Sequence, residues 1–214
     1  MKKLSLLLFC TLLLSCATQE RELDDPVYQY DGGQVSVVDD YGDCFISIKG
    51  PINPSLEKAF NKALSNIKQR NCVEKIVLIH SHGGDLDTAL HIGREIRANQ
   101  FSTDMHGYCE SACAFIYVGG VRRFVHQNSR IAKDSKLGVH QPASELLFHQ
   151  CIWDPNQDPI TVQRISQYLV SMLPKMASDT LYKAIFETSC KKTRYMNATF
   201  LLNSQIATEQ VDFH

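Results

Sequence analysis

The sequence KIVLIHSHGGD at residues 75–85 joins a largely apolar run to a Gly-Gly pair. A short apolar run that is bounded by turn residues predicts a buried strand, here residues 75–80. Apolar and small residues then recur at helical spacing, namely Leu86, Ala89, Leu90, Gly93 and Ile96. The stretch therefore predicts one strand-turn-helix unit of an α/β domain.

The same alternation occurs on both sides of this unit. Upstream, a strand at Cys44 to Ile48 is followed by Asn53-Pro54, a helix cap with proline in the first turn, and then by apolar residues at helical spacing. Downstream, a strand near Phe101 to His106 leads into a helix that is expected to begin at about Glu110. The β-α-β-α-β-α order predicts a mostly parallel sheet with right-handed crossovers.

The beginning of the chain predicts export. Lys2 and Lys3 precede an apolar run, residues 4–14, that is too short to span a bilayer. The run ends in Leu-Leu-Ser-Cys, which looks like the cleavage box of a bacterial lipoprotein with Cys16 as the lipidated residue. Ala17 stands where an inner-membrane retention aspartate would be, so we expect the outer membrane, facing the periplasm. An ordinary signal peptide that contains a cysteine is the alternative.

Three segments follow from this pattern. Residues 1–15 are expected to be the signal peptide, residues 16–34 the lipidated cysteine with a polar tether, and residues 35–214 one folded domain. Without Lys2 and Lys3 the chain has 20 basic and 23 acidic residues, so we expect no nucleic-acid partner. Six cysteines follow Cys16, and export permits disulfides. The expected strand order suggests two pairs, Cys44 with Cys72 and Cys151 with Cys190.

Residues that could support nucleophilic catalysis lie at the strand-to-helix turns, where open α/β sheets tend to bind ligands. Ser111 stands among small residues in the segment Gly-Tyr-Cys-Glu-Ser-Ala-Cys-Ala, residues 107–114. Gly83 and Ala112 could offer backbone N–H groups to an oxyanion. His140 could act as the general base for Ser111. These four residues form the predicted site.

At these positions the chain resembles the Clp protease proteolytic subunit and the wider Clp-protease/crotonase superfamily. The turn Ser-His-Gly-Gly, residues 81–84, is similar to the Ser-Pro-Gly-Gly oxyanion loop of that family, and residues 109–114 are similar to its nucleophile segment. Residues 123–131 and 139–142 resemble the region of the catalytic histidine. The resemblance implies a spiral of β-α-β units and a serine peptidase, which the N-terminal signal would make exported and lipid-anchored. It also implies a peptide or protein substrate and assembly into a homo-oligomer.

The resemblance fails at the third member of the catalytic triad. Thr193 stands where the family has its aspartate, and residues 132–136 look inserted before His140. Three alternatives remain open: a Ser111/His140 dyad, recruitment of another orienting group such as Asn197 or Asp179, or an inactive binding or scaffold lipoprotein.

Two other kinds of site compete with this prediction. His80 and His82 could share a strand face as metal ligands, but Asp85 misses the His-x-His-x-Asp spacing by one residue. Cys109 or Cys113 could be the nucleophile with His140, although neighbouring cysteines in an exported protein more often form a disulfide. We expect no metal and no cofactor.

Overall fold

The computed structural model describes residues 25–128, 133–142, 154–156 and 158–211. Within these residues one mixed sheet runs in the order β1-β2-β3-β4-β5-β6-β9, and β7, itself paired with β8, joins the end of β5. The strands are β1 Val27–Tyr30, β2 Gly33–Asp40, β3 Asp43–Lys49, β4 Lys75–Ser81, β5 Ser102–Glu110, β6 Arg123–Val125, β7 Lys136–Val139, β8 Arg194–Asn197 and β9 Glu209–Gln210. The helices are α1 Pro54–Ile67, α2 Leu86–Ala98, α3 Cys113–Val118, α4 Pro159–Met172, α5 Lys175–Glu187 and α6 Ala198–Asn203.

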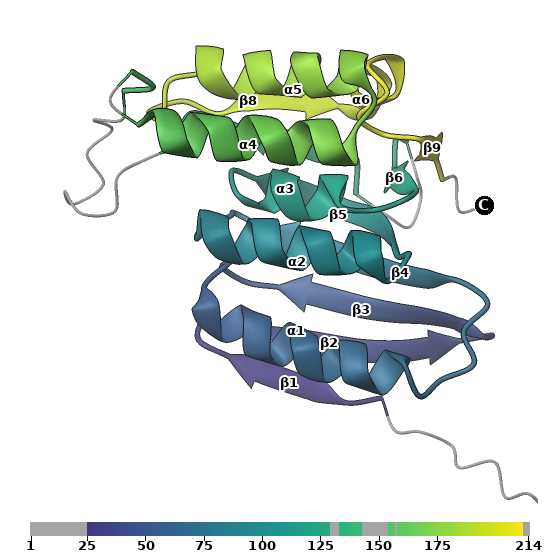
Figure 1. The fold of residues 1–214 in the computed structure, drawn as a ribbon. Helices are drawn as coiled ribbons and strands as arrows, with labels where there is room; N and C mark the ends of the chain where they lie inside the picture. The colour runs from purple at the N-terminus through teal and green to yellow at the C-terminus, as the bar shows by residue number, and fades with distance from the viewer. Residues whose placement is uncertain (1–24, 129–132, 143–153, 157, 212–214) are drawn as a thin grey trace, which may run out of the picture.

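The parallel centre of the sheet confirms the predicted fold class. Strands β3, β4, β5 and β6 are parallel neighbours, and α1 and α2 connect the first three of them. Figure 1 shows α1 to α5 following one another along the molecule as successive β-α units. The start of α1 is capped as predicted, because the side chain of Asn53 accepts hydrogen bonds from the N–H groups of Ser55 and Leu56.

The folded part begins earlier than the predicted boundary at Val35. Strand β1 starts at Val27 and pairs antiparallel with β2, which in turn pairs antiparallel with β3. The turn between β1 and β2 is Asp31-Gly32, with φ +80° at Gly32, and an Asp-Gly pair is a strong hairpin signal. The predicted tether, residues 16–34, therefore contains a strand and a hairpin turn.

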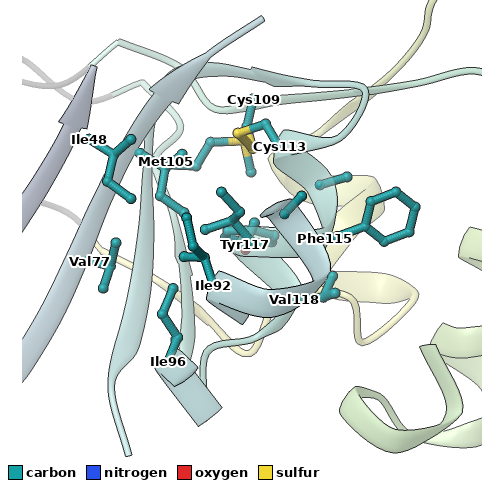
Figure 2. Close-up of a cluster of buried hydrophobic side chains, with 14 of the residues drawn as sticks. Ile48, Val77, Ile92, Ile96, Met105, Cys109, Cys113, Phe115, Tyr117 and Val118 are labelled. Carbon is teal, nitrogen blue, oxygen red and sulfur yellow. A yellow bond between two sulfur atoms is a disulfide. The ribbon is translucent and has the colours of Figure 1, made fainter. Parts of the chain in front are cut away.

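Helices α2, α3 and α4 pack closely against one another beside the buried core, part of which Figure 2 shows. A Cβ on Gly93 of α2 would collide with the hydroxyl of Tyr168 on α4, so only glycine allows this contact. Tyr168 donates a 2.6 Å hydrogen bond to the carbonyl of Phe115 on α3. The Arg97 guanidinium donates to carbonyl groups after α3 and at Met172. These contacts tie α2, α3 and α4 together.

The helix that was expected near Glu110 starts later. Strand β5 continues to Glu110, and α3 begins at Cys113. Strand β5 extends this far because its last residues, Tyr108, Cys109 and Glu110, pair with β7. Ser111 consequently lies between the strand and the helix, rather than in the first turn of the helix.

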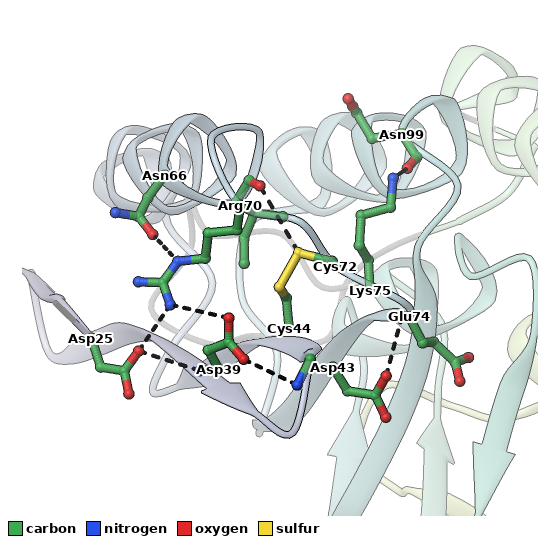
Figure 3. Close-up of a disulfide and its surroundings, with 12 residues drawn as sticks. Asp25, Asp39, Asp43, Cys44, Asn66, Arg70, Cys72, Glu74, Lys75 and Asn99 are labelled. Atoms are coloured by element: carbon green, nitrogen blue, oxygen red, sulfur yellow. Dashed lines mark hydrogen bonds and ion pairs between the residues drawn. A yellow bond between two sulfur atoms is a disulfide. The ribbon is translucent and has the colours of Figure 1, made fainter. Parts of the chain in front are cut away.

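A disulfide joins Cys44 at the start of β3 to Cys72 in the loop after α1, which confirms the predicted pair. Figure 3 shows that the same corner contains an ion pair, in which Arg70 contacts Asp25 at 3.1 Å. Cys190 is also disulfide-bonded, but its expected partner Cys151 lies outside the described residues. The disulfide joins β3 to the loop after α1, and the ion pair joins the segment before β1 to the same loop.

Removal of this disulfide is expected to lower the free energy of unfolding substantially. Its cysteines are 28 residues apart, and a closed loop of that size restricts the unfolded chain by about 3.5 kcal/mol. Urea unfolding of the Cys44→Ala/Cys72→Ala protein measures the loss, and a single Cys72→Ala substitution controls for the thiol that remains. A loss below about 1 kcal/mol would contradict this prediction.

Candidate active site

Ser111 occupies a tight turn between β5 and α3. Its φ is +53°, a left-handed conformation that is uncommon for residues other than glycine and that often occurs at functional sites. Its N–H donates a 2.8 Å hydrogen bond to the carbonyl of Gly138 on β7, and its carbonyl accepts the N–H of Ala114. The strained turn is therefore fixed by the backbone on both sides.

A disulfide encloses this turn. Cys109 is in β5 and Cys113 begins α3, and their sulfur atoms are bonded. Figure 2 shows this bond at the edge of the core, close to Met105. Both cysteines are fully buried. A sulfur atom in a disulfide is not a thiolate nucleophile, so this structure excludes the alternative of a cysteine nucleophile and shows the more common outcome, a disulfide.

The Gly-Gly turn after β4 passes directly against Ser111. Gly83 has φ +97°, and a Cβ there would lie 2.6 Å from the carbonyl oxygen of Glu110 and 2.7 Å from the Cβ of Ser111. The Gly83 N–H donates to the hydroxyl of Ser81 at 3.1 Å, and the Ser81 hydroxyl donates to the carbonyl of Gly50. An oxyanion would have to replace the first of these bonds. Ala112 precedes α3, where N–H groups have no acceptor within the helix.

One cavity of about 880 Å³ brings the predicted site residues together. Its walls come from the β4-α2 turn, the β5-α3 turn, the end of β7 and the two later helices α4 and α5. The lining includes all four predicted residues, Gly83, Ser111, Ala112 and His140, along with apolar and charged side chains that include Phe115, Ile165, Ile185, Asp85 and Arg164. A cavity of this volume and mixed lining is typical of a binding site for an organic ligand.

A backbone carbonyl selects the tautomer that the neutral ring of His140 adopts. Its Nδ1 lies 2.7 Å from the carbonyl oxygen of Gln141. A carbonyl oxygen can only accept, so the proton of the neutral ring is on Nδ1 and the lone pair is on Nε2. In a catalytic triad a carboxylate fixes this tautomer. Here a backbone carbonyl does so.

The residues that were considered as a third member lie at three separate places. Thr193 immediately precedes β8, next to the Val139–Arg194 pair that ends the β7-β8 ladder, and its methyl group lies close to Gly138. Asn197 is opposite Lys136 at the other end of β7, where its side chain caps α6. Asp179 lies on α5 and forms a 2.6 Å ion pair with Lys175. The structure thus gives Asn197 and Asp179 structural partners instead of placing them in the lining of the cavity.

A carboxylate that the sequence reasoning missed lies beside the cavity. Glu110 accepts 2.6 Å hydrogen bonds from His82 Nδ1 and from the hydroxyl of Tyr195. Burial raises the pKa of Glu110. The two hydrogen bonds and the nearby charges of His82 and His140 lower it by more, so the pKa of Glu110 is below its ordinary value. Its position next to Ser111 was visible in the sequence, whereas the β7-β8 pairing that brings Tyr195 to it was not.

His80 on β4 and His82 in the β4-α2 turn do not converge with Asp85. His80 Nδ1 contacts the carbonyl of His106 at 2.7 Å, and His82 contacts Glu110. Asp85 instead caps α2 by accepting the N–H of Thr88 at 2.7 Å. The spacing argument against a His80/His82/Asp85 metal site agrees with this arrangement.

Comparison with known families gives a match to the Clp protease family over residues 36–200. This chain belongs to the Clp protease family. The match includes Gly83, Ser111, His140 and Thr193, so the site that the structure assembles lies inside the family domain. No curated protein matches the sequence.

Solved structures share the fold at low sequence identity. ClpP1 from Listeria monocytogenes is 18% identical, with a TM-score of 0.60 over 79% of this chain and 92% of that one. An enoyl-CoA hydratase from Mycobacterium marinum is 13% identical, with a TM-score of 0.55 over 83% and 77% of the two chains. A membrane-bound stomatin-specific protease is 15% identical, with a TM-score of 0.59 over 78% of each chain. Because peptidases and a hydratase share this fold, the fold alone does not decide the reaction.

Proposed function

We propose that this chain is an exported, lipid-anchored serine peptidase that acts through Ser111 and His140 without an aspartate. The observation that carries the proposal is the strained Ser111 turn, which shares one cavity with a histidine whose Nδ1 proton is held by the Gln141 carbonyl. Membership of the Clp protease family supports hydrolysis of a peptide or protein, and it favours assembly into a homo-oligomer.

The reaction begins with attack of the Ser111 hydroxyl on a peptide carbonyl carbon. His140 Nε2 takes the hydroxyl proton and returns it to the leaving amine, and water then hydrolyses the acyl-enzyme. The N–H of Ala112 stabilises the oxyanion, and the N–H of Gly83 joins it once the bond to Ser81 is released. Glu110 supplies negative charge near His140, which favours the imidazolium that forms during the reaction.

The proposed location is the periplasmic side of the outer membrane, with Cys16 as the lipidated residue. Two disulfides among the described residues support an oxidising compartment. Residues 1–24 lie outside the described part of the chain, so the lipoprotein box is a sequence argument. None of the described helices is long and apolar enough to cross a membrane.

A fluorophosphonate probe tests the serine hydrolase directly. We expect the purified protein to form a covalent adduct on Ser111, and we expect Ser111→Ala to abolish it, because the probe needs an activated serine. Ser178→Ala is the matched control, since this buried serine lies on α5 outside the cavity lining. An unlabelled parent protein would favour the alternative function, an inactive scaffold, which the threonine at position 193 also favours. Labelling that survives in Ser111→Ala would assign the nucleophile elsewhere.

A further inference from the structure

A second cluster of polar side chains lies on β5, at the junction with β6, and the peptidase mechanism does not use it. Asp104 and His106 are two residues apart on β5, and His126 directly follows β6. Asp104 pairs with Phe124, so the same register sets His106 level with His126. One ligand atom from each of the three side chains lies within 4.8 Å of the other two.

The carboxylate of Asp104 uses one oxygen for each histidine. His126 Nε2 lies 2.7 Å from Oδ1, and His106 Nε2 lies 3.4 Å from Oδ2. The two imidazole rings meet edge to face, with centroids 5.2 Å apart. Each histidine therefore directs the same ring nitrogen toward a shared carboxylate.

The surroundings of His126 hold its ring in place. Nδ1 lies 3.1 Å from the carbonyl oxygen of Val211, which accepts the Nδ1 proton and leaves Nε2 directed at Asp104. The backbone N–H of His126 donates to the hydroxyl of Ser135, which in turn donates to the carbonyl of Met105 on β5. Histidines that bind metals usually donate their second ring N–H to a carbonyl or carboxylate in this way.

Burial is uneven across the cluster. The side chains of Asp104 and His126 are 5% and 0% exposed, whereas that of His106 is 45% exposed. The buried pair is thus fixed by the protein, and solvent reaches the cluster on the His106 side. An ion could enter from this side and keep a water molecule as its fourth ligand.

We propose that Asp104, His106 and His126 form a binding site for one divalent transition-metal ion, with Zn²⁺ as the best match. Two imidazole nitrogens and one carboxylate oxygen suit Zn²⁺, whereas Mg²⁺ and Ca²⁺ prefer oxygen ligands alone. Ligand atoms around a tetrahedral zinc ion are about 3.3 Å apart. The two histidines contact different oxygens of Asp104, so an ion held by Oδ2 fits the 3.4 Å contact with His106, and His126 Nε2 has to move from Oδ1 toward that ion.

The site would connect three parts of the chain. It joins β5 to the residue that follows β6, and through Val211 it reaches the residue after β9. Strand β5 bends at this level, because its register with β4 shifts and Gly107 has φ +86°. A bound ion would stabilise the bend five residues before Ser111. This role is independent of the proposed peptidase reaction.

Zinc binding to the full-length protein in detergent tests the proposal. Free thiols are first alkylated with iodoacetamide, metals are removed with EDTA, and Zn²⁺ is titrated in competition with a chromophoric zinc chelator. We expect one ion per chain with a Kd of about 1 μM or below, and a rise in Tm on zinc addition. We expect Co²⁺ to give the strong visible absorption of a tetrahedral site without sulfur ligands.

His106→Asn is the decisive variant, because this half-exposed residue can be replaced with little risk to the fold, and it should weaken zinc binding about 100-fold. The matched control is His91→Asn, which removes another half-exposed histidine that faces a carboxylate, Glu57. His82→Asn tests the neighbouring pair with Glu110. Binding that stays unchanged in His106→Asn, or that is lost equally in His82→Asn, would overturn the proposal, as would a parent protein that binds no zinc below about 100 μM.

Discussion

Replacement of His140 by glutamine is expected to slow phosphonylation of Ser111 by a fluorophosphonate about 10³-fold. Glutamine preserves much of the shape at the cavity wall, but it cannot accept the serine proton. The effect should be on the rate constant of labelling and not on folding, because His140 is only half buried and its ring contacts the backbone of its own neighbour. A labelling time course on gels measures the rate, and Tm shows whether the fold is retained.

Thr193→Val is the control that separates a dyad from a triad. Thr193 is the residue next to the Val139–Arg194 pair, whereas the Nδ1 proton of His140 is already held by the carbonyl of Gln141. Loss of the threonine hydroxyl should therefore change the labelling rate less than 10-fold. A loss as large as that in His140→Gln would mean that Thr193 orients the histidine. A rate in His140→Gln that stays within 10-fold of the parent would exclude His140 as the base.

The parallel half of the fold could be predicted because its signals are local. The apolar run before Ser81 and the capped helix start at Asn53 specify β-α units one at a time. The N-terminal hairpin was missed because the polar residues on either side of Asp31-Gly32 look like a tether. Tyr28 and Tyr30 pack against the core only because β1 pairs with β2 at the edge of the sheet. That contact is tertiary and has no counterpart in sequence periodicity.

The residues of the candidate site also fall into those that local sequence signals predict and those that only strand pairing brings together. Gly83, Ser111, Ala112 and His140 follow from turn chemistry and from the family resemblance, and the structure places all four around one cavity. The Glu110 network and the Asp104 cluster were not predicted. Both depend on strand pairing: β7 with β8 brings Tyr195 to Glu110, and β5 with β6 brings His126 to Asp104. Residue spacing within one segment cannot reveal contacts between strands that are far apart in the chain.

Gly83→Ala is expected to reduce fluorophosphonate labelling of Ser111 at least 100-fold and to lower the free energy of unfolding by about 2–4 kcal/mol. The backbone at Gly83 has φ +97°, which strains any residue that carries a Cβ. The new methyl group would also lie 2.6 Å from the Glu110 carbonyl and 3.0 Å from the Ala112 nitrogen. It would therefore push the nucleophile turn and cover the proposed oxyanion donor.

Gly32→Ala distinguishes the two causes, because Gly32 has a similar φ of +80° but its Cβ would meet only the Pro51 side chain, at 3.0 Å. This control carries the backbone strain without the obstruction of Ser111. We expect it to lose about 1–2 kcal/mol in urea unfolding and to label at the parental rate. If Gly83→Ala lost stability but labelled as fast as Gly32→Ala, the Gly-Gly turn would serve the fold alone. The oxyanion would then be bound without this turn, because the methyl group that Gly83→Ala introduces would obstruct the space that the phosphoryl oxygen of the probe has to occupy.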